Sequence, residues 1–322
     1  MESICAWKQA LETIIADEKI LASAQADNEW FLPELQVIAI QGLISWLEID
    51  RLEALQRAYP KVAAQKRVGL ILAGNIPLVG FHDLFAVLLA GHTAVVKASH
   101  KDRVLMTALF EKSPALLKER IEIVEGLANT SIDFLIGTGS NNTARQIKSK
   151  FAHLPLLMRS NRYSVAILKG NETDTVLDTL SRDVLLYHGM GCRSISNIFV
   201  PKDYELQPLL SALDRFPKDL LASSWWDVQR YQTAIGNVLG KDKKACAAIL
   251  VKEVERLAVP NFGELNIIRY TETAQYWGQL STAKDEIQCV VGDGFIPFGE
   301  AQCPEVDDWA DGVDVLEILT KL

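Results

Sequence analysis

The fold is decided by one apolar stretch, Arg67-Val68-Gly69-Leu70-Ile71-Leu72-Ala73, which Gly74-Asn75 follows. An uninterrupted apolar run of this length predicts a strand buried on both faces, and the Gly-Asn pair predicts the turn that ends it. Phe81–Ala90 then has the spacing of a helix, and Thr93–Lys97 again has the composition of a strand. Strand, helix and strand in this order predict a crossover unit of a parallel sheet.

The same pattern extends in both directions along the chain. Residues 3–58 have helical periodicity, and two further strands are expected at Ile121–Val124 and Ile132–Ile136. From Tyr163 a second series of strands alternates with helices, up to a strand at Ile287–Val291. The sequence therefore predicts two doubly wound α/β lobes. The expected division is N-terminal helices at 1–60, a cofactor-binding domain at 61–162, a catalytic domain at 163–296, and a tail at 297–322 that returns to the cofactor side and serves oligomerisation.

Composition narrows the class of protein. The chain has 322 residues, 49% of them hydrophobic and 23% charged, as in a globular protein of two lobes. A net charge of −8 argues against a general nucleic-acid binder. The five cysteines show no C-x-x-C spacing and the five histidines no ligand spacing, so we expect no metal. With no signal peptide at the N-terminus, a reducing, cytoplasmic location is expected.

One segment is long and apolar enough to suggest a membrane span. Val68–Ala98 is interrupted, however, by Gly74-Asn75, Pro77 and His82-Asp83, and its two ends are rich in β-branched residues. Two buried strands that flank a helix explain this composition better than a span, so none is expected.

Ligands of doubly wound sheets bind beyond the carboxyl ends of the strands, so the loops there are candidate sites. Gly137-Thr138-Gly139-Ser140 stands between a strand and a helix, where backbone N–H groups can hold a phosphate, although such turns favour Gly and Ser in any case. Lys97 can hold a ribose or phosphate, or extend into solvent. Asn75 can donate to an oxyanion, or can simply form a turn.

Cys192 is the candidate nucleophile. It lies in Gly189-Met190-Gly191-Cys192 between a predicted helix and a predicted strand, and the glycines allow a sharp turn and close approach of a substrate. His188 and Arg193 are placed to favour its thiolate. The other four cysteines have apolar or terminal contexts typical of packing residues, a role that also remains open for Cys192.

Taken in order, these segments resemble the aldehyde-dehydrogenase superfamily from about residue 60 onward. Gly69–Pro77 is similar to the stretch that carries its oxyanion asparagine, and Leu89–Ser99 to the strand that ends in its cofactor-ribose lysine. Gly137–Arg145 resembles its nicotinamide-cofactor loop, and Gly189–Cys192 falls at the place of its catalytic cysteine. Four motifs in the right order carry more weight than any one of them.

The resemblance implies a role for each candidate. Cys192 and Asn75 would be catalytic. Two groups of residues would hold the cofactor. The first group is Lys97, Ser99 and His100, and the second is the loop Gly137, Thr138, Gly139 and Ser140. The tail segments Pro297–Pro304 and Asp308–Asp314 resemble those of the acyl-CoA reductases related to the fatty-acid reductase of bacterial bioluminescence. The implied activity is reduction of an acyl-CoA to an aldehyde through a cysteine thioester.

Two departures from the superfamily refine this expectation. The stretch Arg159–Ser164 stands where oxidising members carry a glutamate base, so no group would activate water against a thioester. His100 stands where NAD-preferring relatives often have a glutamate, and Lys97 and Lys101 are nearby, which favours NADPH over NADH.

Three hypotheses and two structural expectations follow. The alternatives to an acyl-CoA reductase are an acyl-phosphate reductase of the same superfamily and a catalytically degenerate scaffold. Members of the superfamily exchange a C-terminal strand, and the apolar segment Val313–Leu319 would need such a partner, so a homodimer is expected. Trp225, Trp226 and Tyr231 either line an acyl tunnel or pack in the core, and core packing is favoured.

Overall fold

The computed structural model describes residues 2–159, 161–238 and 243–322, and the chain forms two compact units. Unit 1 consists of residues 1–161 together with 305–322, and unit 2 consists of residues 162–304. The last residues of the chain therefore return to the unit in which it begins. No helix in the described part of the chain combines the length and the apolar character that a membrane span requires.

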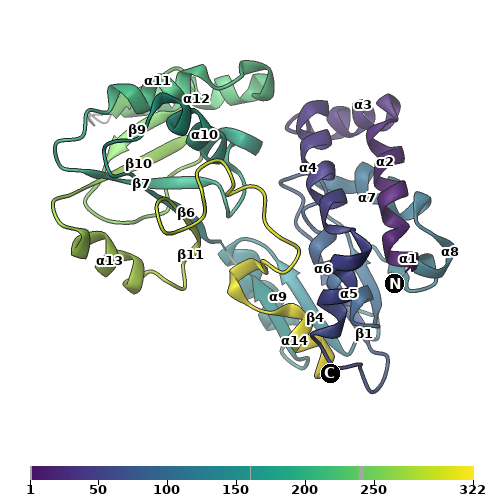
Figure 1. Ribbon diagram of the computed structural model, residues 1–322. Coiled ribbons are helices and arrows are strands. Elements are labelled where there is room, and N and C mark those ends of the chain that lie inside the picture. The colour runs from purple at the N-terminus through teal and green to yellow at the C-terminus, as the bar shows by residue number, and fades with distance from the viewer. Residues whose placement is uncertain (1, 160, 239–242) are drawn as a thin grey trace. The chain divides into compact units, whose positions relative to one another are not determined.

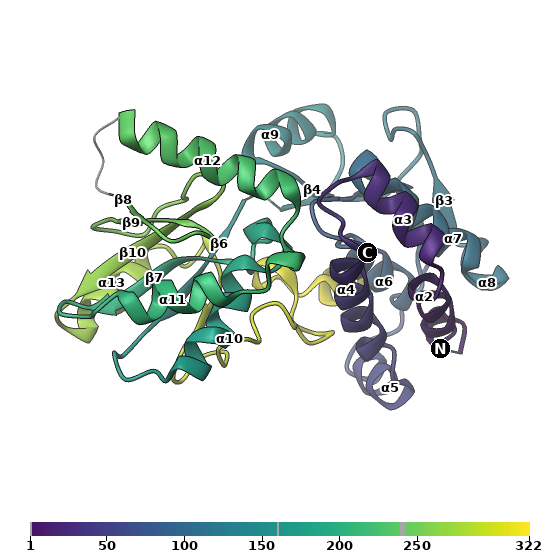
Figure 2. The same cartoon turned by 90° about the horizontal axis from the view of Figure 1, so that it is seen from above.

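Unit 1 begins with a group of helices that pack on one another, α2, α3 and α4 lying side by side (Figure 2). Their bounds are α1 (Glu2–Cys5), α2 (Trp7–Ile15), α3 (Glu18–Asp27), α4 (Pro33–Trp46) and α5 (Ile49–Arg57). Trp7, Leu11 and Ile14 recur at helical spacing on α2 and are fully buried. Helix α3 begins where the Asp17 carboxylate accepts the N–H groups of Lys19 and Ile20.

The sheet of unit 1 has the strand order β3-β2-β1-β4-β5, and every described pair is parallel. The strands are β1 (Arg67–Ile71), β2 (Thr93–Lys97), β3 (Ile121–Ile123), β4 (Phe134–Thr138) and β5 (Leu156–Arg159). The connecting helices are α6 (Phe81–Leu89), η1 (His100–Asp102), α7 (Arg103–Lys112), α8 (Ala115–Lys118) and α9 (Asn141–Lys150). The predicted α/β class is confirmed, whereas β5 was not predicted from the sequence.

The C-terminal segment is helical, which corrects the expectation of an exchanged strand at Val313–Leu319. After the short turn η4 (Ala310–Gly312), helix α14 (Val315–Thr320) packs against α6 (Figure 1). Val315 and Leu319 are fully buried in the core of unit 1, and the Leu319 carbonyl oxygen lies 2.8 Å from Nε2 of His92. The apolar pattern is thus satisfied within the chain itself, and the expected homodimer loses this support.

Unit 2 contains a second sheet, with strand order β11-β6-β7-β10-β9-β8, in which β8 is antiparallel to β9 and the other pairs are parallel. The strands are β6 (Tyr163–Ile167), β7 (Ile195–Pro201), β8 (Lys243–Ala245), β9 (Leu250–Glu253), β10 (Glu264–Tyr270) and β11 (Ile287–Val291). The helices are α10 (Asp174–Leu185), η2 (Leu186–Gly189), α11 (Gln207–Arg215), η3 (Lys218–Leu220), α12 (Ser223–Val238) and α13 (Thr273–Thr282). Helices α10, α11 and α12 cover one face of the sheet, and α13 lies on the other (Figure 1).

Candidate active site

The candidate residues of unit 1 lie together at one edge of its sheet. Asn75 follows β1, Lys97 ends β2, and the segment from Gly137 to Ser140 ends β4 and leads into α9. Because all the strands are parallel, their carboxyl ends meet at this edge. Strands β1 and β4 are neighbours although β2 and β3 lie between them in the sequence. This is a topological switch point, the place where open α/β sheets bind ligands.

The loop that carries Asn75 packs directly on the loop after β2. A β-carbon added at Gly74 would lie 2.6 Å from both Cβ and Oγ of Ser99, so no side chain fits there. The backbone hydrogen bonds between β1 and β2 continue one residue past β1, because the Leu72 N–H donates to the Lys97 carbonyl oxygen at 3.2 Å. Asn75 itself is partly exposed. The glycine therefore allows Asn75 and the Lys97–His100 segment to lie close together.

The segment after β2 carries the second group of candidates. Lys97 and Ser99 are partly exposed and His100 is exposed. The Ser99 Oγ accepts the Lys101 N–H at 3.3 Å and thereby caps the turn η1. Ser99 has a local structural role in addition to any contact with a ligand.

The glycine loop after β4 fits a phosphate group. Ser140 is the N-cap of α9, and its hydroxyl oxygen accepts the Thr143 N–H at 3.2 Å. A β-carbon at Gly139 would lie 2.8 Å from the Thr143 side chain, so glycine is required for this close turn. The first N–H groups of a helix carry partial positive charge and attract anions. Lys97 lies at the same edge of the sheet, at the end of β2, which β1 separates from β4.

The stretch compared with the segment that carries the glutamate base begins with a buried ion pair. Arg159 ends β5 with 6% of its surface exposed, and its Nη1 donates to Oδ1 of Asp83, itself 5% exposed, at 2.6 Å. Among the described residues, the Nε and Nη2 of Arg159 have no hydrogen-bond partner. Ser160, also in the stretch compared with the glutamate segment, lies outside the described residues. Since a guanidinium stays protonated in proteins, Arg159 cannot act as a base.

Cys192 lies in unit 2, just before β7, and is exposed. Its loop closes on itself, because the Gly191 N–H donates to the Ser194 hydroxyl and the Ser194 N–H to the Gly191 carbonyl oxygen. The buried hydroxyl of Ser164, on β6, donates to the Cys192 carbonyl oxygen at 2.8 Å. Ser164 also accepts the Cys289 N–H at 3.1 Å. An exposed thiol on an anchored loop can act as a nucleophile.

His188 anchors the turn before this loop, and the prediction that its charge favours the Cys192 thiolate is wrong. Burial lowers the pKa of His188 to about 4, so the imidazole is neutral. Its Nε2 accepts the Ala222 N–H at 2.9 Å. Tyr187 and His188 both have positive φ, 53° and 58°, which is uncommon for residues other than glycine. The histidine thus holds a disfavoured turn in place.

The segment 299–302 braces the other side of the Cys192 loop. Buried Asp183, on α10, accepts the Gly299 N–H at 2.6 Å and the Ala301 N–H at 3.0 Å. The Gln302 side chain then donates to the Ser194 hydroxyl at 3.1 Å, and Arg193 Nε donates to the Ala301 carbonyl oxygen. Arg193 and Ser194, the two residues that follow Cys192, are therefore tied to this segment. The sequence did not predict this role of Asp183, because its partners Gly299 and Ala301 lie 116 and 118 residues later in the chain.

The aromatic residues of α12 have different environments. Trp225 is buried, and its Nε1 donates to the Ala248 carbonyl oxygen at 2.8 Å, whereas Tyr231 is 64% exposed. Trp226 is partly exposed beside a shallow hollow along the helix. Core packing thus accounts for Trp225.

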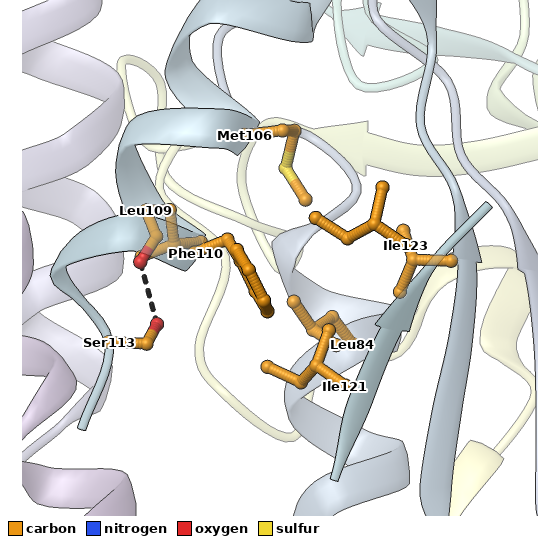
Figure 3. Close-up of a pocket in the computed structure, with 8 residues that line it drawn as sticks. Leu84, Met106, Leu109, Phe110, Ser113, Ile121 and Ile123 are labelled. Carbon is orange, nitrogen blue, oxygen red and sulfur yellow. Dashed lines mark hydrogen bonds between the residues drawn. The ribbon is translucent and has the colours of Figure 1, made fainter. Parts of the chain in front are cut away.

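An enclosed cavity in unit 1 is too small and too apolar to be a ligand site. Its volume is about 10 Å³, the space of a single water. The Ser113 hydroxyl, its polar group, donates to the Leu109 carbonyl oxygen at 2.6 Å (Figure 3). It is lined by Leu84, Val96, Met106, Leu109, Phe110, Ser113, Ile121 and Ile123. Among the described residues, no group of three metal-ligating side chains occurs.

The sequence was compared with known protein families and with curated proteins. Residues 47–214, just over half of the chain, match the family described as acyl-CoA reductase (LuxC). No curated protein matches the sequence.

Several solved structures share the fold and cover 90% of this chain. A P. syringae indole-3-acetaldehyde dehydrogenase mutant with NAD+ and IAA is 16% identical, with TM-score 0.65 over 70% of its length. An NAD-dependent benzaldehyde dehydrogenase from Corynebacterium glutamicum is 13% identical, with TM-score 0.66 over 74%. A Mycobacterium tuberculosis aldehyde dehydrogenase complexed with NAD+ is 17% identical, with TM-score 0.64 over 72%. At these identities the likeness concerns the fold.

Proposed function

The chain belongs to the acyl-CoA reductase (LuxC) family, and on that premise we propose that it reduces an acyl-CoA to an aldehyde with NAD(P)H through a thioester on Cys192. The observation that carries the proposal is the exposed thiol of Cys192 on a loop whose backbone is tied down by Ser164. An aldehyde-dehydrogenase-like oxidoreductase is what family and fold indicate. The acyl-CoA substrate and the thioester on Cys192 are what our proposal adds to this.

In the first half-reaction, the Cys192 thiolate attacks the carbonyl carbon of the acyl-CoA. A carbon–sulfur bond forms, and the carbonyl electrons move to oxygen, giving a tetrahedral oxyanion. The side-chain amide of Asn75 and the backbone N–H of Cys192 are the donors we assign to this oxyanion. When the oxyanion collapses, the bond to CoA breaks and CoA leaves as a thiolate that takes a proton from solvent.

In the second half-reaction, the enzyme thioester is reduced. A bound nicotinamide cofactor supplies the hydride. Addition to the thioester carbonyl and protonation of its oxygen give a thiohemiacetal on Cys192. Its collapse breaks the carbon–sulfur bond, returns the hydroxyl proton to solvent and releases the aldehyde together with the Cys192 thiolate.

Arg159 supports the reductive direction. Hydrolysis of the thioester would need a base to activate water, and the stretch compared with the glutamate segment has no carboxylate and begins with Arg159, which is paired with Asp83. Water would therefore compete poorly, and the thioester would persist until it meets hydride or CoA.

Residues of unit 1 are assigned to the cofactor. In this proposal Lys97 and Ser99 hold the ribose beyond β2, and the Gly137–Ser140 loop holds the pyrophosphate at the N-terminus of α9. His100 and Lys101 are exposed and present no carboxylate to a 2′-phosphate, which favours NADPH over NADH. None of the five cysteines, all of which lie among the described residues, forms a disulfide, which suits a reducing cytoplasm.

The test is intact-mass detection of an acyl adduct on the protein mixed with an acyl-CoA without cofactor. We expect the adduct in wild type and in Cys303→Ala, which removes the other exposed thiol, and its loss in Cys192→Ala. Steady-state rates with NADPH and NADH on acyl-CoAs of graded length then define the substrate. Adduct formation from an acyl phosphate but not from acyl-CoA would support the alternative reductase. An unmodified wild-type protein would support a non-catalytic scaffold.

A further inference from the structure

The loop that carries Asn75 contains a residue in a disfavoured conformation. Leu78, three residues after Asn75, has φ +51°, and its side chain is fully buried. The left-handed region crowds the β-carbon of any residue other than glycine, so it persists only where the surroundings impose it. Leu78 turns the chain from β1 into α6 and thus helps to set the direction of the Asn75 side chain.

A buried carboxyl group holds this conformation. The Leu78 N–H donates to Oδ2 of Asp102 at 2.9 Å. Asp102 is 2% exposed, and within the described residues its Oδ1 has no hydrogen-bond partner. Burial raises the pKa of Asp102 well above its ordinary range. A buried carboxyl that is only half satisfied costs stability, which calls for a reason to keep it.

The position of Asp102 on its own helix does not supply that reason. Asp102 is the N-cap of α7, where an aspartate usually accepts the N–H groups of the first turn. Its side chain makes no such bond and reaches instead to a loop 24 residues earlier. The carboxyl group therefore serves the Asn75 loop rather than α7.

The same residue belongs to the segment assigned to the cofactor. Asp102 ends the turn η1, which directly follows Lys97–Ser99, and its N–H donates to the Ser99 carbonyl oxygen at 3.2 Å. A β-carbon at Gly74 would lie 3.1 Å from the Asp102 β-carbon, so the two loops are in tight contact. A displacement of one loop is transmitted to the other.

We propose that Asp102 is a positioning residue, which fixes Asn75 through the Leu78 N–H and couples the oxyanion donor to the cofactor segment. The inference rests on the oxyanion role assigned to Asn75 in the proposed function. Asp102 touches neither substrate nor cofactor in this proposal. It acts by keeping the loop between β1 and α6 in a single conformation.

The test compares three variants with wild type. Asp102→Leu is nearly isosteric and has no acceptor, Asp102→Asn keeps an acceptor for Leu78, and Arg103→Ala changes the exposed neighbour on α7. The first readout is amide hydrogen exchange of residues 74–80, which needs no activity. The second is the rate of acyl-adduct formation on Cys192, measured well below the melting temperature, together with kcat, KM and NADPH affinity.

In Asp102→Leu we expect exchange at Leu78 at least tenfold faster. Adduct formation and kcat should be about 10- to 100-fold slower, a part of the effect of losing an oxyanion donor. NADPH affinity should fall as well, by about three- to tenfold, because the Lys97–Ser99 segment packs on the loosened Asn75 loop at Gly74. Asp102→Asn and Arg103→Ala should behave like wild type. A purely structural role would lower the melting temperature and leave the rate and the exchange of folded protein unchanged.

Two results would overturn the inference. The first is that Asp102→Leu exchanges the amide hydrogens of residues 74–80 and forms the Cys192 adduct at the wild-type rates. The second is that the rate of adduct formation falls as much in Asp102→Asn as in Asp102→Leu. If wild type forms no adduct at all, the proposed function fails, while the exchange data still decide whether Asp102 holds the loop. Asp102→Ala, with a smaller side chain, replaces the leucine variant if that variant does not fold.

Discussion

The hydroxyl group of Ser164 donates a hydrogen bond to the carbonyl oxygen of Cys192 at 2.8 Å. Ser164 is fully buried on β6, and its oxygen also accepts the Cys289 N–H. The backbone of the nucleophile is thus fixed to the core of the sheet in unit 2. This contact leads to the first of four predictions.

Ser164→Ala should leave the Cys289 N–H and the Cys192 carbonyl oxygen without this partner, and lower stability by about 1–3 kcal/mol. Adduct formation on Cys192 should slow by about tenfold, because the loop is no longer held in one geometry. Urea denaturation and intact-mass kinetics measure the two effects. Ser181→Ala is the matched control, since this buried hydroxyl bonds within its own helix to the Asp178 carbonyl oxygen. Equal adduct rates in both variants would contradict the prediction.

Asp183 should give the stability a distinctive pH dependence. Burial raises the pKa of Asp183 to about 6, above its value of about 3.9 in an unfolded chain. Ionisation therefore costs folding free energy, and this cost appears as the pH rises from about 4 to 6. The free energies of unfolding of wild type and Asp183→Asn should accordingly diverge in this window by on the order of 1–3 kcal/mol.

The same variant tests the brace around Cys192. An asparagine amide cannot accept both the Gly299 and the Ala301 N–H, so this segment should loosen and exchange faster in Asp183→Asn. The charged and titratable groups that influence Asp183 are Arg182, Arg193 and Cys303, none of which the variant alters. A parallel pH dependence in the two proteins would show that Asp183 does not titrate in this range.

His188 should act in the opposite pH sense. Its folded-state pKa of about 4 lies below the value of about 6.5 in an unfolded chain. The unfolded state therefore binds the proton first, and stability is lost as the pH falls from about 6.5 towards 4. His188→Gln keeps an acceptor for the Ala222 N–H and cannot titrate, so we expect a shallower loss of stability on acidification. Thermal melts at half-unit pH steps measure it, and identical slopes would contradict the prediction.

The Asp83–Arg159 pair should be strongly coupled. Asp83→Leu leaves the guanidinium buried without a counter-charge and should cost about 3–5 kcal/mol, as is usual for breaking a buried pair. Asp83→Leu combined with Arg159→Met should cost much less than the sum of the single variants. A double-mutant cycle by urea denaturation measures the coupling. The exposed pair Lys8–Glu48 is the control, for which less than about 1 kcal/mol is expected. Additive effects at Asp83 and Arg159 would refute the coupling.

Much of the fold could be predicted from the sequence, because burial leaves a periodic pattern. The apolar run from Arg67 to Ala73 became β1, and the helical spacing at Phe81–Ala90 became α6. Strand β5 was missed because its side chains are only partly buried for most of its length. The segment Val313–Leu319 was misjudged because an apolar run of seven residues suits a strand and a short buried helix equally well.

The candidate site was only partly visible in the sequence. Asn75, Lys97 and the Gly137–Ser140 loop could be proposed from the sequence because each lies at the carboxyl end of a recognisable strand. Asp102, Ser164 and Asp183 act through contacts with residues that are distant in the sequence, and no local pattern marks them. His188 was misread because proximity in the sequence suggested a charge that burial removes.

The return of residues 305–322 to unit 1 has a consequence for biosynthesis. On the ribosome these residues emerge after the whole of unit 2, which is continuous in the chain and can fold as soon as it has been made. Until then, α6 lacks α14, and the His92 ring lacks the Leu319 carbonyl group. Unit 1 is thus begun before unit 2 and completed after it, so a chain that stalled before α14 would expose apolar surface of α6 to chaperones and proteases.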